Sequence, residues 1–327
     1  MLSRTLRQRI GGLLRDGWGP RSNGTNGYLP GLEPPRLEPR RHFVSTGIEE
    51  ILPGGVVETE HGPVFAHERL YTDLGERPVP LLRRLADLCV YPGCELDEPD
   101  SNGSGPRYVE VPGVDCPYPP DRARRRPRDL PEAVGLYDPP ERGLFRRFGH
   151  RRVLYMDIET CGLSAAPVFL VGLCTVGDRN LVLRQLFARD YAEEKALLAE
   201  VRRVAGEHDF LVTFNGKAFD VPFLRDRAVH HRLPTPIEMP HLDLLWMARR
   251  RWKEILPDCK LKTIEWRVLR RRRAGDVGGS EIPGLYHDYV KRGEAHRLLP
   301  VFHHNLLDVV AMVELTPVIF DPEVTVY

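Results

Sequence analysis

Two acidic residues close an apolar segment of the chain. Asp157 and Glu159 lie two positions apart at the end of the run VLYMDI (153–158), which predicts a buried strand. Side chains at positions i and i+2 of a strand leave the same face, so both carboxylates should project together. Like charges this close repel each other, and a hard divalent cation such as Mg²⁺ or Mn²⁺ would relieve that repulsion. A strand that ends in solvent could carry the same two residues, so this pair alone does not distinguish a metal site from an exposed strand end.

A third carboxylate, Asp220, follows another predicted strand at 210–214. Asn215 and Gly216 after this strand are a turn signal, and a helix is expected to begin near Phe219. Asp220 would then occupy the first turn of that helix. An acid there complements the helix dipole, which explains Asp220 but not the dense pattern NGKAFDVPFL that surrounds it.

The fourth carboxylate belongs to a predicted long amphipathic helix at 298–315. Asp308 follows His303 by five positions and His304 by four. Residues four apart share one helix face, so His304 should lie beside Asp308. A His/Asp pair on an exposed helix surface would explain the same spacing.

Taken in order, these three patterns resemble the DEDD superfamily of 3′–5′ exonucleases, which has a ribonuclease H-like fold. The matching residues are Asp157, Glu159 and Thr160 in the first motif, Asn215, Phe219 and Asp220 in the second, and His304 and Asp308 in the third. Segments between the motifs, such as HLDLL at 241–245, further resemble the YprB-like branch, a bacterial group of predicted exonucleases. The stretch 42–90 also resembles the segment that precedes the domain in this branch.

The resemblance implies hydrolysis of phosphodiester bonds in single-stranded DNA or RNA by two Mg²⁺ or Mn²⁺ ions. The four carboxylates would hold the ions, with Asp157 bridging them, so that one ion activates the attacking water and the other stabilises the leaving 3′-oxygen. A His or Tyr beside the last Asp would act as general base or position the water. The Tyr branch has its aromatic residue four before the Asp, and the His branch has its His five before. This sequence has His at both places; helix geometry favours His304, and His303 stays a candidate.

Other residues near the motifs are candidate contacts to nucleic acid. These are Thr160, Asn215, Lys217 and Phe219. Lys217 could meet a phosphate, whereas the apolar neighbours of Phe219 favour a core position over contact with the terminal nucleotide. Asp243, at the end of a predicted strand, fits a carboxylate close to the metal ions and a helix cap equally well.

Clusters of arginine and tryptophan follow the second motif. The arginine runs at 249–251 and 270–273 would help to hold a phosphate backbone, although charge runs more often form solvated faces. Tryptophans stand near these runs, at Trp246, Trp252 and Trp266. They could stack on single-stranded bases, but positions in a helix core are the simpler expectation.

The elements that must position these residues follow from apolar periodicity. Strands predicted at 153–158, 168–176 and 181–187 have short connections, which indicates an antiparallel meander. Strands at 210–214 and 241–244 then alternate with helices, one of them at 191–205 behind a capping box formed by Asp190 and Glu193. This order predicts an α/β fold with a mixed five-stranded sheet flanked by helices, as the ribonuclease H-like resemblance also implies.

Composition divides the chain into three parts. Residues 1–41 are rich in Gly, Pro and Arg and are expected to form a disordered tail. Residues 42–145 should form a small, irregular accessory region with a Pro-rich linker, including a hairpin that turns at 61–63 and a helix at 81–88. Residues 146–320 should form the exonuclease domain.

Charge and hydropathy exclude several classes of protein. The chain has 47 Lys and Arg against 46 Asp and Glu, a net charge of +1, which argues against a globally basic coat protein. Its longest uncharged apolar stretch, 164–177, is too short and too broken by Gly and Pro to span a membrane. The first residues lack the apolar core of a secretion signal, so we expect a cytoplasmic protein, with organelle targeting by the Arg-rich start as the alternative.

The six cysteines are expected to stay reduced, without a disulfide partner. Cys89, Cys94 and Cys116 are close in sequence, but there is no CxxC pair and no evident fourth ligand. A zinc site is therefore not favoured.

Two other functions stay open from the sequence. One is a non-catalytic nucleic-acid-binding module on the same fold, although such a module has no need to keep four mutually repelling acids. The other is a structure-specific endonuclease whose substrates are chosen by the N-terminal region. Product size separates the two nucleases, since an exonuclease releases mononucleotides and an endonuclease releases internal fragments.

Overall fold

The computed structural model describes residues 47–90, 139–163, 165–273, 275–324 and 326 of the 327-residue chain. The predicted tail 1–41, most of the Pro-rich linker, and Cys94 and Cys116 lie outside the described residues.

Seven strands form one mixed sheet in the order β1-β2-β5-β4-β3-β6-β7. The strands are β1 (Gly55–Thr59), β2 (Gly62–Leu70), β3 (Val153–Thr160), β4 (Val168–Val176), β5 (Leu181–Phe187), β6 (Phe210–Thr213) and β7 (His241–Asp243). Neighbours from β1 to β3 pair antiparallel, whereas β6 runs parallel to β3 and β7 runs parallel to β6. The predicted α/β class and mixed sheet are confirmed.

The sheet is larger than the five strands expected from the sequence. The predicted hairpin is present as β1 and β2, although its turn lies at residues 60 and 61 and not at 61–63. Strand β2 pairs with β5, so the hairpin extends the sheet beyond the meander. This pairing joins segments more than a hundred residues apart in the chain. Local periodicity carries no information on such a distant partner, so the sequence pattern does not predict this pairing.

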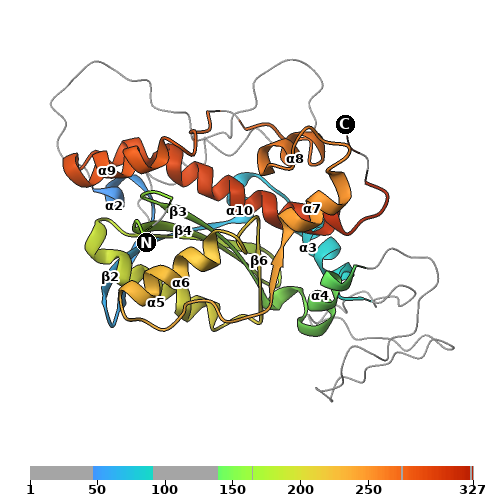
Figure 1. The fold of residues 1–327 in the computed structure, drawn as a ribbon, viewed down its shortest axis with the longest axis horizontal. Coiled ribbons are helices and arrows are strands. Elements are labelled where there is room, and N and C mark those ends of the chain that lie inside the picture. Colours follow the sequence, from blue (N-terminus) through green and yellow to red (C-terminus); the bar gives the residue numbers. More distant parts are fainter. Residues whose placement is uncertain (1–46, 91–138, 164, 274, 325, 327) are drawn as a thin grey trace.

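Helices cover both faces of the sheet (Figure 1). The α-helices of the described residues are α2 (Ile48–Ile51), α3 (Pro78–Asp87), α4 (Gly143–Phe148), α5 (Glu194–Ala205), α6 (Asp220–His230), α7 (Leu244–Trp252), α8 (Leu261–Arg267), α9 (Ile282–Arg292) and α10 (Leu299–Ile319). Figure 1 shows α5 and α6 on one side of the sheet and α7, α8 and α10 on the other.

The long helix α10 is buried almost all round, not amphipathic as expected. It packs on β3 and β4 on one side and is covered by α3, α7 and α8 on others. Its only residues that are not buried are Leu299, Pro300 and Asp308. The segment Ala295–Ile319 is long and apolar enough to cross a membrane, but 83% of its most apolar window is buried inside the protein.

The expected capping box before α5 is half formed. The Asp190 carboxylate accepts hydrogen bonds from the N–H groups of Ala192 (2.8 Å) and Glu193 (3.2 Å). The Glu193 carboxylate instead accepts from the Arg189 N–H at 2.9 Å and from its guanidinium. Glu193 therefore binds Arg189 and not the N–H group of Asp190, which a complete capping box would require.

Candidate active site

Strand β3 directs its two acids toward α10. Along this strand Met156 and Ile158 join the core that contains residues of α5, while Tyr155 packs in the cluster that contains residues of α10. Asp157 and Glu159 alternate with Met156 and Ile158, so they share the face of Tyr155. The apolar strand thus carries both carboxylates into the space between the sheet and α10.

The four carboxylates expected from the motifs act on one another electrostatically. Burial raises the pKa of Asp157 well above its usual range, and the charges of the other three add to the shift. Burial, followed by repulsion from neighbouring acids and opposed by His304, raises the pKa of Glu159 to about 8. Burial also raises the pKa of Asp220 to about 7, with repulsion from Asp243 and Asp308. The fold therefore gathers acids that resist being charged together.

The chemistry of this cluster fits a divalent cation. Its donors are carboxylate oxygens, the ligands that Mg²⁺ and Mn²⁺ prefer, and a cation would offset their repulsion. No group of three or more His, Cys, Asp or Glu side chains within the described ranges has the spacing of a formed metal site. The chemistry of the donor set nevertheless fits the ion.

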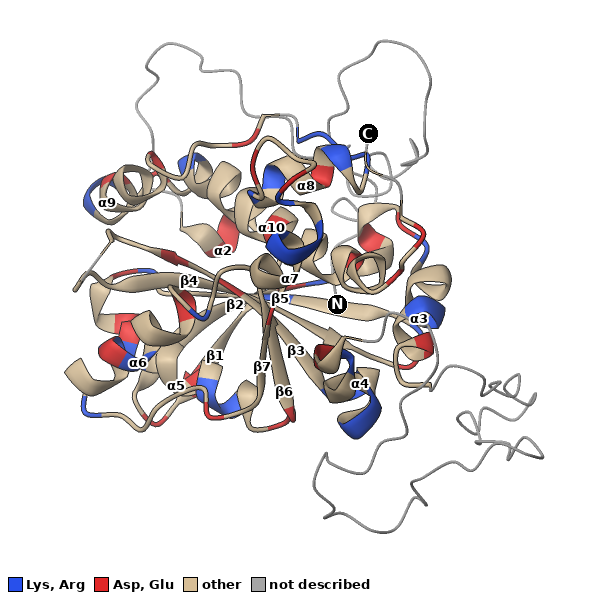
Figure 2. Ribbon diagram, turned by 45° about the vertical axis from the view of Figure 1, so that its right-hand side comes forward, with Lys and Arg blue, Asp and Glu red and all other residues tan. Residues whose placement is uncertain are grey.

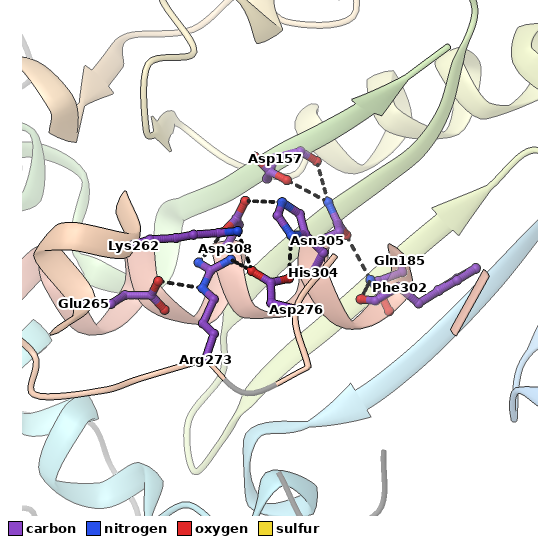
Figure 3. Close-up of polar contacts among 10 residues, drawn as sticks. All are labelled: Asp157, Gln185, Lys262, Glu265, Arg273, Asp276, Phe302, His304, Asn305 and Asp308. Atoms are coloured by element: carbon purple, nitrogen blue, oxygen red, sulfur yellow. Dashed lines mark hydrogen bonds and ion pairs between the residues drawn. The ribbon is translucent and has the colours of Figure 1, made fainter. Parts of the chain in front are cut away.

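An arginine compensates the cluster at Asp308 (Figure 3). Arg273, in the segment between α8 and α9, pairs with the Asp308 carboxylate. Its Nε also donates to Glu265 at 2.6 Å, and its Nη1 lies 3.4 Å from Asp276. The side chain is only 6% exposed, so its charge serves these acids and is not presented to solvent.

The expected role of the arginine run 270–273 is therefore partly wrong. Arg271 and Arg273 face inward, where Arg271 pairs with Glu314 at 2.6 Å and with Glu76 at 2.8 Å. Because these two guanidiniums balance internal carboxylates, they do not form an outer phosphate-binding surface. The sequence of an arginine run does not reveal that its side chains pair with acids, because those acids lie far away in the sequence.

His304 is placed between two carboxylates (Figure 3). Its Nδ1 hydrogen-bonds Asp276 Oδ1 at 2.6 Å, and its Nε2 lies 3.5 Å from Asp308 Oδ2. Burial opposes the charged imidazole, but the hydrogen bond to Asp276 and the charges of Asp308 and Glu159 leave the pKa of His304 above its ordinary value. The contact with Asp276 orients the ring so that Nε2 faces the acids.

His303 has a different environment. Burial lowers its pKa to about 4, which favours the neutral ring. Its Nδ1 is buried without a hydrogen-bond partner among the described residues. In this arrangement His304, and not His303, directly contacts Asp308.

Asn305 connects the first and third motifs. Its Nδ2 donates to Asp157 Oδ2 at 2.9 Å, and its Oδ1 accepts from Gln185 Nε2 at 2.9 Å. Asp157, Gly172 and Gln185 are register neighbours on β3, β4 and β5, and Asn305 lies over the glycine. A Cβ at Gly172 would overlap Asn305 Oδ1, so the absent side chain makes room for this bridge.

Asp243 holds the loop that leads to Asp220. Its carboxylate accepts from the N–H groups of Asn215 at 2.8 Å and Lys217 at 3.0 Å. It also accepts from the Leu245 N–H at 3.0 Å and so caps α7. Asn215 adopts a left-handed conformation with φ 69°, which asparagine tolerates better than most residues. Asp243 therefore combines the two expected features, since it caps a helix and also lies next to the acid cluster.

The remaining candidate contacts differ in exposure. Phe219 is partly buried and packs against Phe223 with ring centroids 5.3 Å apart, in line with a core position. Thr160 is buried, and its hydroxyl donates to the Gly162 carbonyl at 2.7 Å. Lys217 is exposed.

Several residues at the site were missed by the sequence analysis. They are Gln185, Lys262, Glu265, Asp276 and Asn305. Asn305 directly follows His304, so its position in the third motif was a usable signal. Asp276 lies in a Gly-rich connection without periodicity, and nothing local distinguishes it from a loop acid.

Comparison with known proteins agrees with this architecture. Residues 154–319 match a family model described as the RNase H superfamily. The chain is 34% identical over 177 residues to the uncharacterized protein YprB of Bacillus subtilis (strain 168); this match covers 51% of the chain and 42% of YprB.

One solved structure has a weak similarity to part of this chain. It is the family B DNA polymerase of the archaeon Pyrobaculum calidifontis, with a TM-score of 0.40, 19% identity, and coverage of 50% of this chain and 24% of the polymerase. The family match includes β3 through α10 and all four carboxylates. The chain belongs to the RNase H superfamily of nucleases.

Proposed function

We propose that this protein is a metal-dependent 3′–5′ exonuclease that hydrolyses single-stranded DNA or RNA. One observation carries the proposal: Asp157, Glu159, Asp220 and Asp308 come from three separate segments, and burial together with the charges of the neighbouring acids raises the pKa of the first three. Such clustering of like charges costs stability and is typical of sites that bind a cation. Two Mg²⁺ or Mn²⁺ ions held by these carboxylates would supply the activated water and the Lewis acid for the leaving 3′-oxygen.

The neighbouring side chains have distinct parts in this proposal. Asn305 orients Asp157 through its 2.9 Å hydrogen bond. His304 accepts the proton of the attacking water at Nε2, while Asp276 holds its Nδ1. Asp243 fixes the loop ahead of Asp220.

The test is a nuclease assay on 5′-labelled single-stranded DNA and RNA with Mn²⁺ or Mg²⁺. We expect a ladder of progressively shorter labelled products and release of mononucleotides, with loss of both in EDTA. Asp157→Asn should lose activity in the same way because it removes one carboxylate charge with little change in volume. Circular single strands should resist cleavage, since an exonuclease needs an end.

Other outcomes would support other functions. Cleavage of circles would identify an endonuclease. Binding of strands without cleavage, equal in wild type and Asp157→Asn, would identify a binding module on this fold. In such a module the ion pair of Arg273 with Asp308 would neutralise the Asp308 charge in place of a metal ion.

A further inference from the structure

Two tryptophans are exposed on the helices beside the acid cluster. In the described part of the chain Trp252 is buried, whereas Trp246 on α7 and Trp266 on α8 are 57% and 42% exposed. The expectation of a core position therefore holds for Trp252 alone. Both helices pack on α10, which carries Asp308, and Figure 1 shows them next to each other. Exposed aromatic side chains near a functional site are typical of binding surfaces.

A cation lies over each exposed ring. Lys217 Nζ is 5.6 Å from the centroid of Trp246. The guanidinium carbons of Arg267 and Arg272 lie 4.0 and 4.6 Å from the centroid of Trp266. Neither Lys217 nor Arg272 forms an ion pair with a carboxylate of the described residues, so both charges stay available to an anionic ligand. Figure 2 shows other basic residues on α7 and α8.

The first pair is attached to the Asp220 side of the cluster. The Lys217 N–H donates to the Asp243 carboxylate at 3.0 Å, and Trp246 follows Asp243 by three residues. The charge of Asp243 in turn acts on Asp220. Lys217 and Trp246 are therefore held by the same carboxylate that fixes the loop of the second motif.

The second pair is attached to the Asp308 side. Arg272 directly precedes Arg273, which pairs with Asp308. Trp266 directly follows Glu265, which accepts a hydrogen bond from Arg273 at 2.6 Å. The arginine run is thus divided: Arg273 faces inward to the acids, whereas Arg272 is exposed over an indole.

An exposed indole with a cation over its ring suits one class of ligand particularly well. In single-stranded nucleic acid the bases are free to stack on aromatic rings, and the adjacent phosphates pair with Lys or Arg. Of the four acids Asp220 is buried and the other three are half-buried, whereas Lys217 and Arg272 are exposed. In a duplex the flat faces of the bases are covered by their neighbours.

We propose that Trp246 with Lys217 and Trp266 with Arg272 form two base-stacking subsites for single-stranded nucleic acid. The first lies on the Asp220 side of the cluster and the second on the Asp308 side. This inference rests on the nuclease function proposed above and specifies how the substrate is held.

The test compares strand binding by the full chain and its variants. Binding of 5′-labelled oligo(dT) and oligo(U) of about twelve nucleotides is followed by fluorescence anisotropy in Ca²⁺. Trp246→Ala and Trp266→Ala should each weaken binding roughly tenfold, and Trp→Phe at each position should keep most of it because the aromatic face remains. Ile255→Ala is the matched control, since Ile255 is an exposed apolar side chain (64%) just beyond α7 and has no cation over it.

Intrinsic tryptophan fluorescence distinguishes base stacking from a purely structural role of the two tryptophans. A base stacked on an indole quenches the emission of that indole, so adding the strand should quench the fluorescence of the wild-type protein. The quenching should be smaller in each Trp→Phe variant. Unchanged affinity in both Trp→Ala variants of a protein that cuts and binds strands would overturn the inference and leave the proposed function intact. A protein that neither cuts nor binds strands would overturn both. Trp-dependent binding without cleavage would support the subsites and overturn only the proposed activity.

Discussion

At the scale of single residues, the site is a balance between buried negative charge and its partners. Burial and mutual repulsion raise the pKa values of Asp157, Glu159 and Asp220. Arg273 and His304 offset part of this charge at Asp308. The acids were predictable because their spacing shows in the sequence. Their partners were less so, because Asp276 and Arg273 come from a connection whose path only the folded chain defines.

Asp276 is expected to position His304. Replacement by Asn keeps the volume but removes the carboxylate that holds Nδ1 at 2.6 Å, so the ring loses its fixed orientation. We expect Asp276→Asn to lower kcat by roughly 10- to 100-fold with little change in KM, the size of effect typical of residues that orient a functional side chain. Steady-state kinetics measure this, with Asp288→Asn, in α9, as the control. Equal kcat values in the two variants would contradict the assignment.

The raised pKa values also predict how stability depends on pH. A carboxyl with a raised pKa in the folded state binds protons more tightly there than in the unfolded chain, so its contribution favours folding at low pH. For Glu159 that contribution should be lost between the ordinary value near 4.5 and the folded value of about 8. Metal-free protein should therefore become less stable across this window, and Mg²⁺ or Mn²⁺ should restore more stability at pH 8 than at pH 5.

Glu159→Gln isolates this effect. The amide carries no charge, so the variant should unfold at a higher temperature than wild type at pH 8 without metal, and the two should converge toward pH 5. Thermal unfolding measures both, and Glu254→Gln, an exposed carboxylate, serves as the control. Parallel pH profiles for wild type and Glu159→Gln would show that repulsion at this site does not affect stability.

At the scale of elements, the fold shows where local patterns suffice and where they do not. β3, β4 and β5 appear in the sequence as apolar runs with short connections, and the structure has them as predicted. The pattern of α10 was misleading, since its few polar residues suggested a solvated face. His303, His304 and Glu314 are instead buried beneath neighbouring helices. Which helices cover an element is a long-range property that periodicity cannot report.

The contact between β4 and α10 can be tested at Gly172. An added methyl group would overlap Asn305 and push it away from Asp157. We expect Gly172→Ala to lower the free energy of unfolding by about 1–3 kcal/mol, as overpacking does, and to reduce nuclease activity. Urea unfolding measures the stability, and Gly284→Ala, where nothing lies within 4 Å of the new Cβ, is the matched control.

A second substitution makes this test specific. In a Gly172→Ala background, Asn305→Ala should cost less stability than it does in wild type, because the first change has already broken the bridge. Additive losses of stability would mean that Gly172 and Asn305 do not interact as described.

At the scale of the whole molecule, the N-terminal segment and the family domain share one sheet. β2 pairs with β5, and Tyr71 just after β2 donates to Glu314 of α10 at 2.6 Å. Glu314 also pairs with Arg271, two residues before Arg273. The hairpin is thus connected through buried polar groups to the segment that reaches the acids. Although the net charge is only +1, the four acids of the site are buried or half-buried while Lys217 and Arg272 are exposed.

The most direct test of the central claim compares two acids of one helix. Asp220 and Asp226 both belong to α6, but Asp220 is buried in the cluster and the Asp226 side chain is 78% exposed. Nuclease activity with Mn²⁺ on labelled single strands should be lost in Asp220→Asn and retained in Asp226→Asn. Full activity in Asp220→Asn would contradict the claim that the clustered carboxylates form the metal-dependent active site.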